Sequence, residues 1–302
     1  MRRRTIVFLL VLLVSSALVL AIAAKSRLPA GVTRGKIKSA ELDRTYLLYV
    51  PESYDPATPA PLVISMHGFA SWPANQMSVS HWNRLADQHG FIVAYPSGTG
   101  FPKRWNTSGQ ASEDAADDVA FLSDLIDTLS QRFNIDPGRI YANGFSNGAG
   151  MANLLACELP HRIAAIGGVA GAYSNPAKGC EPSRPIPVIA FHGTADPIVP
   201  YAGGAAGPGG FVFPAVPDWA AAWAKRNGCE GTSVALPAFG EVSGVQYTNC
   251  DENADVIFYT VVGGGHSWPG GGMLPKAIVG HMTEDIDASA VMWEFFTQHA
   301  LK

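Results

Sequence analysis

The sequence predicts an α/β fold, a mostly parallel central sheet of about eight strands with helices on both faces. Three observations lead to this prediction. Strand-like and helix-like runs alternate along the chain, a glycine-rich turn at 144–148 joins one such pair directly, and two further motif-bearing loops follow apolar runs. Strands are expected at 36–39, 45–50, 62–66, 91–95, 140–143, 164–169, 188–191 and 256–261, and helices at 79–89, 117–133, 147–157, 217–227 and 287–299.

Hydrophobic periodicity supports the individual elements. Residues 62–66 and 188–191 are short apolar runs, which are typical of buried parallel strands, whereas 256–261 alternates. Residues 233–248 indicate a hairpin. In the helix at 117–133 the apolar side chains recur at helical spacing and mark a buried face: Val119, Leu122, Leu125, Ile126, Leu129 and Phe133.

The turn Gly144-Phe145-Ser146-Asn147-Gly148 follows a β-branched and aromatic run and precedes a helix-like run. In that setting G-x-S-x-G indicates the nucleophile elbow of an α/β-hydrolase, where the serine hydroxyl is exposed at a helix N-terminus. The two glycines are needed because strand and helix approach closely there. By itself the pattern is equally compatible with an ordinary strand–turn–helix connection.

An acid and a histidine follow in the order that this fold requires, each in a loop beyond a strand. Asp196 lies in His192-Gly193-Thr194-Ala195-Asp196-Pro197, and His266 in Gly263-Gly264-Gly265-His266-Ser267-Trp268. A serine hydroxyl becomes nucleophilic when an imidazole takes its proton, and a carboxylate orients that imidazole. We therefore assign Ser146 as the nucleophile, His266 as the general base and then acid, and Asp196 as the orienting carboxylate.

An oxyanion hole needs two N–H donors, one from the residue after the nucleophile and one from the loop after the third strand. The first is the Asn147 backbone. For the second we expect the Phe69 N–H, with Ala70 as the alternative.

These motifs together resemble the secreted esterase family that includes polyhydroxybutyrate depolymerases and feruloyl or acetylxylan esterases. The resemblance runs from about Arg44 to the C-terminus. The motifs that carry it occur in one order: His67-Gly68, Trp105-Asn106, Asp117-Asp118-Val119-Ala120-Phe121, the turn at 144–148, the run at 192–201 and Gly265-His266-Ser267-Trp268-Pro269-Gly270. The resemblance implies carboxylic ester hydrolysis through an acyl-enzyme on Ser146.

Composition agrees with a folded enzyme that is exported. The chain has 302 residues, of which 47% are hydrophobic and 15% charged, and its net charge of −4 gives no footprint for nucleic acid. Arg2-Arg3-Arg4 precedes an apolar run from about Ile6 to Ala24 that includes an A-x-A cleavage pattern. Residues 1–24 are thus a signal peptide or an N-terminal membrane anchor, and 25–302 are expected to form a single catalytic domain. We expect a secreted or periplasmic monomer, which an anchor would hold on the outer face of the cytoplasmic membrane.

Four cysteines in an exported chain predict disulfides. Of the three possible pairings we favour Cys157–Cys180 and Cys229–Cys250, because each closes a short local loop. Metal binding is disfavoured, since no C-x-x-C occurs and no histidine lies at ligand spacing; no metal and no cofactor are expected.

Several residues near the predicted site have two interpretations. Phe69, Trp105 and Trp268 either contact the substrate or, for the two tryptophans, pack the loops that carry the site. His67 and His192 are interpreted as structural hydrogen-bonding residues rather than second bases. Asp117 and Asp118 are interpreted as helix-start residues rather than a metal pair.

The predicted substrate is a soluble or oligomeric ester: a feruloyl or acetyl ester, or a short hydroxyalkanoate oligomer. Two other functions are compatible with the same scaffold. One is an acyltransferase that passes the acyl group of Ser146 to an alcohol, and the other is a non-catalytic surface binding protein descended from an esterase.

Overall fold

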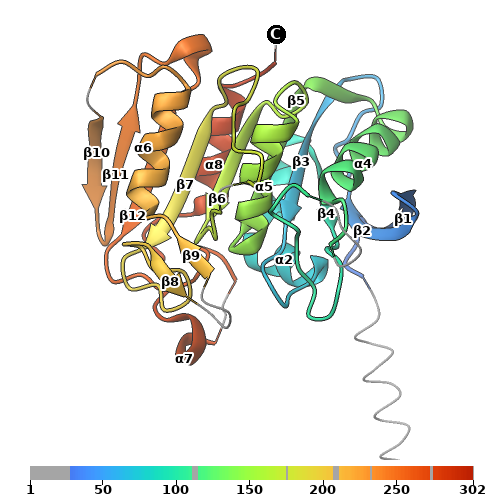
Figure 1. Cartoon of the computed structure of the whole chain (residues 1–302). Coiled ribbons are helices and arrows are strands. Elements are labelled where there is room, and N and C mark those ends of the chain that lie inside the picture. The colour runs from blue at the N-terminus through green and yellow to red at the C-terminus, as the bar shows by residue number, and fades with distance from the viewer. Residues whose placement is uncertain are drawn as a thin grey trace, which may run out of the picture.

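The computed structural model describes residues 28–110, 115–174, 176–206, 211–231, 233–272 and 275–301. The targeting segment predicted at 1–24 lies outside this range. A ten-stranded sheet runs across the molecule in the order β1-β2-β4-β3-β5-β6-β7-β12-β11-β10 (Figure 1). Its strands are β1 (Val32–Ser39), β2 (Leu42–Tyr49), β3 (Ala60–Met66), β4 (Ile92–Pro96), β5 (Ile135–Phe145), β6 (Ala165–Val169), β7 (Val188–Gly193), β10 (Val234–Phe239), β11 (Val242–Tyr247) and β12 (Val256–Val261).

The centre of the sheet, from β4 through β12, is parallel, and both margins are antiparallel. The predicted α/β fold is confirmed. The sheet has ten strands rather than about eight because the hairpin β10–β11 pairs with β12 and extends the sheet instead of standing apart. A separate two-stranded ribbon is formed by β8 (Gly204–Ala206) and β9 (Phe211–Phe213).

Helices cover both faces of the sheet (Figure 1). They are α2 (Pro73–Ser80), α3 (Trp82–His89), α4 (Asp118–Arg132), α5 (Asn147–Glu158), α6 (Val216–Arg226), α7 (Lys276–Val279) and α8 (Ala288–Thr297), with a 3₁₀ turn at Asp251–Asn253. On one face, α4, α5 and α6 bury Phe121, Leu154 and Trp223 against the sheet. On the other face, α3 and α8 bury Trp82 and Phe296, which stack on each other.

The helix predicted at 79–89 is wrong at its start. Two helices occupy this region, and His81 between them has φ 55°. A left-handed residue cannot continue an α-helix, so the chain turns there. Pro73 opens α2 at its first turn, where a proline costs no intrahelical hydrogen bond.

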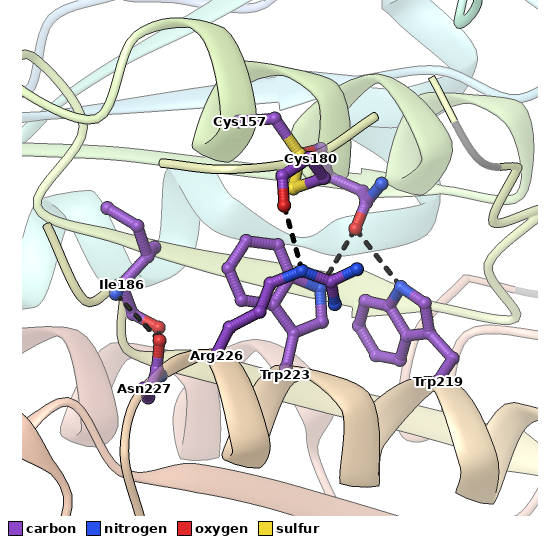
Figure 2. The surroundings of a disulfide bond; sticks show 8 residues. Cys157, Cys180, Ile186, Trp219, Trp223, Arg226 and Asn227 are labelled. Atoms are coloured by element: carbon purple, nitrogen blue, oxygen red, sulfur yellow. Dashed lines mark hydrogen bonds between the residues drawn. A yellow bond between two sulfur atoms is a disulfide. The ribbon is translucent and has the colours of Figure 1, made fainter. Parts of the chain in front are cut away.

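Both predicted disulfides are present, Cys157–Cys180 and Cys229–Cys250. The first ties the end of α5 to the segment before β7, beside α6 (Figure 2). Arg226 of α6 donates to the Cys180 carbonyl, and the indole N–H groups of Trp219 and Trp223 both donate to Asn153 of α5. The α5–α6 contact is therefore fixed by polar as well as apolar groups.

Candidate active site

Ser146 occupies a sharp turn between β5 and α5. Its backbone has φ 55° and ψ −117°, a conformation that is strained for any residue with a side chain. The flanking glycines are required by space: a Cβ on Gly144 would lie 2.3 Å from the Gly148 carbonyl carbon, and one on Gly148 would lie 2.2 Å from the Met66 carbonyl oxygen. The geometry of the turn is thus that of a nucleophile elbow.

Hydrogen bonds on both sides hold the turn in this conformation. The Ser146 N–H donates to the Val169 carbonyl at the end of β6. The Ser146 carbonyl accepts from the N–H groups of Ala149, Gly150 and Ala172. The surrounding backbone therefore stabilises a strained residue, as is typical of functional sites.

Asp196 and His266 are in direct contact at the same edge of the sheet. His266 Nδ1 lies 2.8 Å from Asp196 Oδ2, and both side chains are almost fully buried. Because a carboxylate oxygen can only accept, Nδ1 carries the proton and Nε2 is left with a free lone pair. This is the tautomer that can take a proton from a serine.

A second histidine contacts the same carboxylate oxygen. His192 Nε2 lies 3.3 Å from Asp196 Oδ2 and 2.9 Å from the Val199 carbonyl oxygen. The other oxygen, Oδ1, accepts the N–H groups of Ile198 and Val199. Burial raises the pKa of the Asp196 carboxyl, but the hydrogen bonds from His192 and His266 outweigh burial and hold that pKa below its usual value. Asp196 is therefore ionised throughout the working pH range.

The backbone beside α7 supports the loop that carries His266. The His266 N–H donates to the Val279 carbonyl, and the Gly265 N–H donates to the His281 carbonyl at 2.7 Å. A Cβ on Gly265 would lie 2.0 Å from the Val279 carbonyl oxygen, so only glycine allows this approach. The glycine run before His266 thus has a steric reason.

Phe145, the residue before Ser146, packs against His266, with its ring centroid 4.8 Å from that of the imidazole. Among the described residues, the Ser146 hydroxyl makes no hydrogen bond to the imidazole. Catalytic hydrogen bonds are often long in unliganded enzymes and shorten when the substrate is bound.

His67 holds the start of the predicted oxyanion loop. Its Nδ1 lies 2.7 Å from the Gly68 carbonyl oxygen, and its Nε2 accepts the Gly98 N–H. The Ala70 N–H donates to the Lys103 carbonyl at 2.8 Å and is already engaged. No such bond engages the Phe69 N–H within the part of the chain that the structure describes. Of the two alternatives, the geometry favours Phe69.

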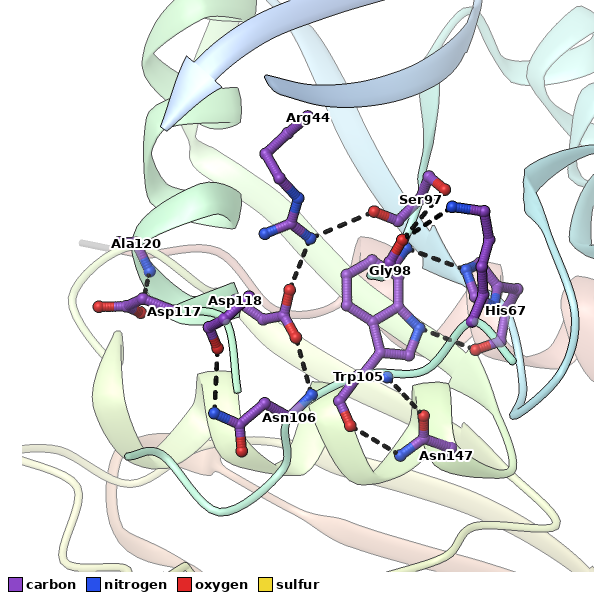
Figure 3. A network of polar contacts seen from close by, with 12 residues as sticks. Arg44, His67, Ser97, Gly98, Trp105, Asn106, Asp117, Asp118, Ala120 and Asn147 are labelled. Atoms are coloured by element: carbon purple, nitrogen blue, oxygen red, sulfur yellow. Dashed lines mark hydrogen bonds and ion pairs between the residues drawn. The ribbon is translucent and has the colours of Figure 1, made fainter. Parts of the chain in front are cut away.

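Asn147 ties the elbow to the loop after β4, a role that the sequence did not indicate. Its side chain accepts the Trp105 N–H at 2.7 Å and donates to the Trp105 carbonyl, while the Trp105 indole donates to the His67 carbonyl (Figure 3). Trp105 is 2% exposed and Trp268 1%, which favours loop packing over substrate contact for both. Phe69, by contrast, is 57% exposed.

The predicted helix-start role of Asp117 is confirmed, because its side chain accepts the Ala120 N–H. Asp118 also lies at the helix start, as the first residue of α4, and it has a further role. It is buried in an ion pair with Arg44, and its second oxygen accepts the Asn106 N–H (Figure 3). Burial raises the pKa of Asp118 despite the Arg44 guanidinium. Together these bonds anchor the loop that holds Trp105. In the described ranges no three His, Cys, Asp or Glu side chains are grouped to hold a metal ion.

Comparison with known proteins shows the family of this chain. The family described as Esterase PHB depolymerase matches residues 44–199, just over half of the chain. The chain belongs to the Esterase PHB depolymerase family. It is accordingly a carboxylic ester hydrolase, and the resemblance drawn from its motifs is confirmed.

Several proteins that are similar to this chain are named as esterases. Feruloyl esterase B of Piromyces equi is 32% identical over 234 residues, which cover 74% of this chain and 42% of that protein. Feruloyl esterase C of Emericella nidulans is 26% identical over 264 residues, which cover 84% of this chain and 83% of that protein. The acetyl xylan esterase from Aspergillus awamori shares the fold, with a TM-score of 0.63 and 16% identity over 88% of this chain and 99% of the other.

Proposed function

We propose that this esterase is exported and cleaves its substrate through an acyl-enzyme on Ser146, with His266 as base and Asp196 as orienting carboxylate. The observation that carries the proposal is the buried 2.8 Å contact between His266 Nδ1 and Asp196 Oδ2, on the loops beside the Ser146 elbow. With its proton on Nδ1, the His266 imidazole keeps a lone pair on Nε2 with which it can take the proton of Ser146.

Acylation begins when the Ser146 hydroxyl transfers its proton to His266 Nε2 and Oγ attacks the ester carbonyl carbon. The carbonyl oxygen becomes an oxyanion, which the backbone N–H groups of Phe69 and Asn147 stabilise. The imidazolium is stabilised by Asp196 and then gives its proton to the leaving alkoxide. The C–O bond of the ester breaks, and an alcohol departs.

Deacylation repeats these steps with water. His266 takes a proton from the water, the hydroxide oxygen attacks the acyl carbon, and the second tetrahedral intermediate collapses. The bond to Ser146 Oγ breaks, the serine regains the proton from His266, and a carboxylic acid leaves. No cofactor enters this cycle.

For the substrate we propose soluble or oligomeric esters, namely feruloyl or acetyl esters or short hydroxyalkanoate oligomers. The names of the relatives support the first two. The exposed Phe69 ring supports an apolar or aromatic acyl group, because it lies next to the proposed oxyanion donors. Assays with esters that vary the acid and the alcohol separately will identify the preferred class.

Export is supported by the two disulfides, since such bonds persist in oxidising compartments. It is also supported by the sequence of residues 1–24, which we propose is a signal peptide or an anchor. Among the described residues, no helix has the length and apolar character that crossing a bilayer requires. We propose further that 25–302 is one catalytic domain and acts as a monomer.

The proposal is tested with Ser146→Ala. We expect hydrolysis of p-nitrophenyl acetate to fall by at least about 10⁴-fold while the unfolding temperature stays within a few degrees of the wild type. The matched control is Ser130→Ala, an exposed serine of α4, which should keep full activity. A fluorophosphonate should label the wild type on the peptide that contains Ser146. Turnover by Ser146→Ala, or labelling elsewhere, would refute the assignment. An added alcohol acceptor distinguishes hydrolysis from acyl transfer.

A further inference from the structure

A cavity of about 450 Å³ lies between the β1–β2 margin of the sheet and the start of α2. This volume is within the range of small-molecule sites. Arg34 pairs with Leu47 and Lys36 with Thr45 across the two strands, so these four side chains share one face of the ribbon. The cavity is lined by that face, by Leu28, Gly35, Tyr46 and Ser97, and by Trp72, Pro73 and Ala74.

Two walls of this cavity continue directly into the candidate oxyanion loop. Trp72 follows Gly68 by four residues, and a Cβ on Gly68 would lie 3.3 Å from the Ser146 Cβ. Four residues span at most about 14 Å, so the Trp72 wall lies within roughly 20 Å of Ser146. At the other wall, Ser97 precedes Gly98, whose N–H donates to His67 (Figure 3). Both connections place the cavity on the side of the sheet that carries the oxyanion loop.

The cavity has the chemistry of an anion site. Its lining contains two cations and no carboxylate, although the chain as a whole carries a net charge of −4. Lys36 contacts Asp43 at 2.9 Å, but both side chains are more than half exposed, so this pair contributes little and can open. Arg34 makes no ion pair within the described ranges. A guanidinium binds a carboxylate through two parallel hydrogen bonds.

Trp72 adds a flat apolar wall beside the two cations. The residue is 56% exposed, although a large aromatic side chain gains most when it is buried. Thr45 and Ser97 belong to the same lining. Two cations and one aromatic face together suit a carboxylate that is attached to a sugar ring or to a short aliphatic chain.

We propose that this cavity is a second subsite that binds a carboxylate carried by the substrate some distance from the scissile ester. The inference rests on the proposed ester hydrolysis at Ser146. Two sources supply this chemistry: the uronic acid residue of an esterified oligosaccharide, and the free carboxyl end of a hydroxyalkanoate oligomer. In either case Arg34 is the main carboxylate ligand, and Trp72 supports the unit that carries it.

The test compares matched substrates with and without the carboxylate. One pair is a 3-hydroxybutyrate oligomer and its terminal amide; the other is an acetylated xylo-oligosaccharide with and without a glucuronic acid branch. In the wild type we expect KM to be about fivefold lower for the acidic member of at least one pair, and the difference to fade at high salt. In Arg34→Gln the ratio should fall to near one. Lys38→Gln, an exposed cation of the same strand outside the cavity, is the matched control and should keep the wild-type ratio.

The pair that discriminates identifies the source of the carboxylate. The inference is overturned if neither pair discriminates, or if Arg34→Gln keeps the wild-type ratio. Titration of Ser146→Ala with the acidic oligomers measures binding without catalysis, and Arg34→Gln in that background should weaken it about fivefold. Wild-type hydrolysis of p-nitrophenyl acetate tests the esterase separately: its failure would count against the proposed function, whereas a lost preference alone counts only against the subsite.

Discussion

His67 should make the stability of this enzyme fall as the pH drops below neutral. The Gly68 carbonyl can only accept and the Gly98 N–H can only donate, so the ring between them must be neutral, with its proton on Nδ1. Burial is the main cause that lowers the pKa of His67 to about 4; the Gly68 hydrogen bond opposes it and the Lys103 charge assists it. An unfolded histidine has a pKa of about 6.5.

The sign and size follow from proton binding. Between about pH 6.5 and about pH 4 the unfolded chain binds a proton at His67 and the folded chain does not, so lowering the pH favours unfolding. A pKa difference of about 2.5 corresponds to about 3 kcal/mol of unfolding free energy, fully present above pH 6.5 and lost by about pH 4.

Urea unfolding at a series of pH values between about 7 and 4 measures this effect. In His67→Gln, which cannot titrate, the decline in unfolding free energy should be shallower by about 3 kcal/mol over this range. His161→Gln replaces an exposed histidine and should leave the slope unchanged. If His67→Gln keeps the wild-type slope, His67 is not held neutral in the folded state and the reasoning fails.

Two further predictions follow from side chains beside the site. His192→Phe removes the Nε2–H group that binds the Val199 carbonyl and lies 3.3 Å from the ionised Asp196. A polar contact with a charged group is worth about 1.5 kcal/mol, so kcat/KM should fall about tenfold. His192→Gln keeps a donor and should recover part of the loss, and equal activity of the Phe variant and the wild type would contradict this role. Replacing Cys157 and Cys180 by Ala opens a loop of 23 residues and should lower the unfolding free energy by about 3 kcal/mol, as measured by urea unfolding. A loss below about 1 kcal/mol would show that the crosslink hardly constrains the unfolded chain.

The alternation of strand-like and helix-like runs was sufficient to predict the fold class and most elements. The features that could not be predicted are those for which the sequence carries no clear local pattern. Nothing about a histidine requires a left-handed backbone, so the break at His81 between α2 and α3 was not predicted. The hairpin β10–β11 was predicted, but its pairing with β12 was not, because strand partners depend on contacts between distant segments.

The candidate site shows the same division. The order of Ser146, Asp196 and His266 could be found because each belongs to a short motif after a strand. The contact of His192 with Asp196 and the hydrogen bond between Asn147 and Trp105 could not be predicted, because neither belongs to such a motif. His192 was assigned a structural hydrogen-bonding role without a partner. Only the folded chain shows that its Nε2 binds the Val199 carbonyl at 2.9 Å and lies 3.3 Å from Asp196 Oδ2.

The sequence by itself determined which residue types stand at the ends of which strands, because turns, helix starts and buried runs are encoded by near neighbours. Only the tertiary structure decided which of those ends meet. It placed His192 beside Asp196, bound the Ala70 N–H to the Lys103 carbonyl while giving the Phe69 N–H no partner among the described residues, and formed the cation-lined cavity beside Trp72. Each of these depends on where the sheet brings distant segments together, and hydrophobic burial across the whole core sets that arrangement.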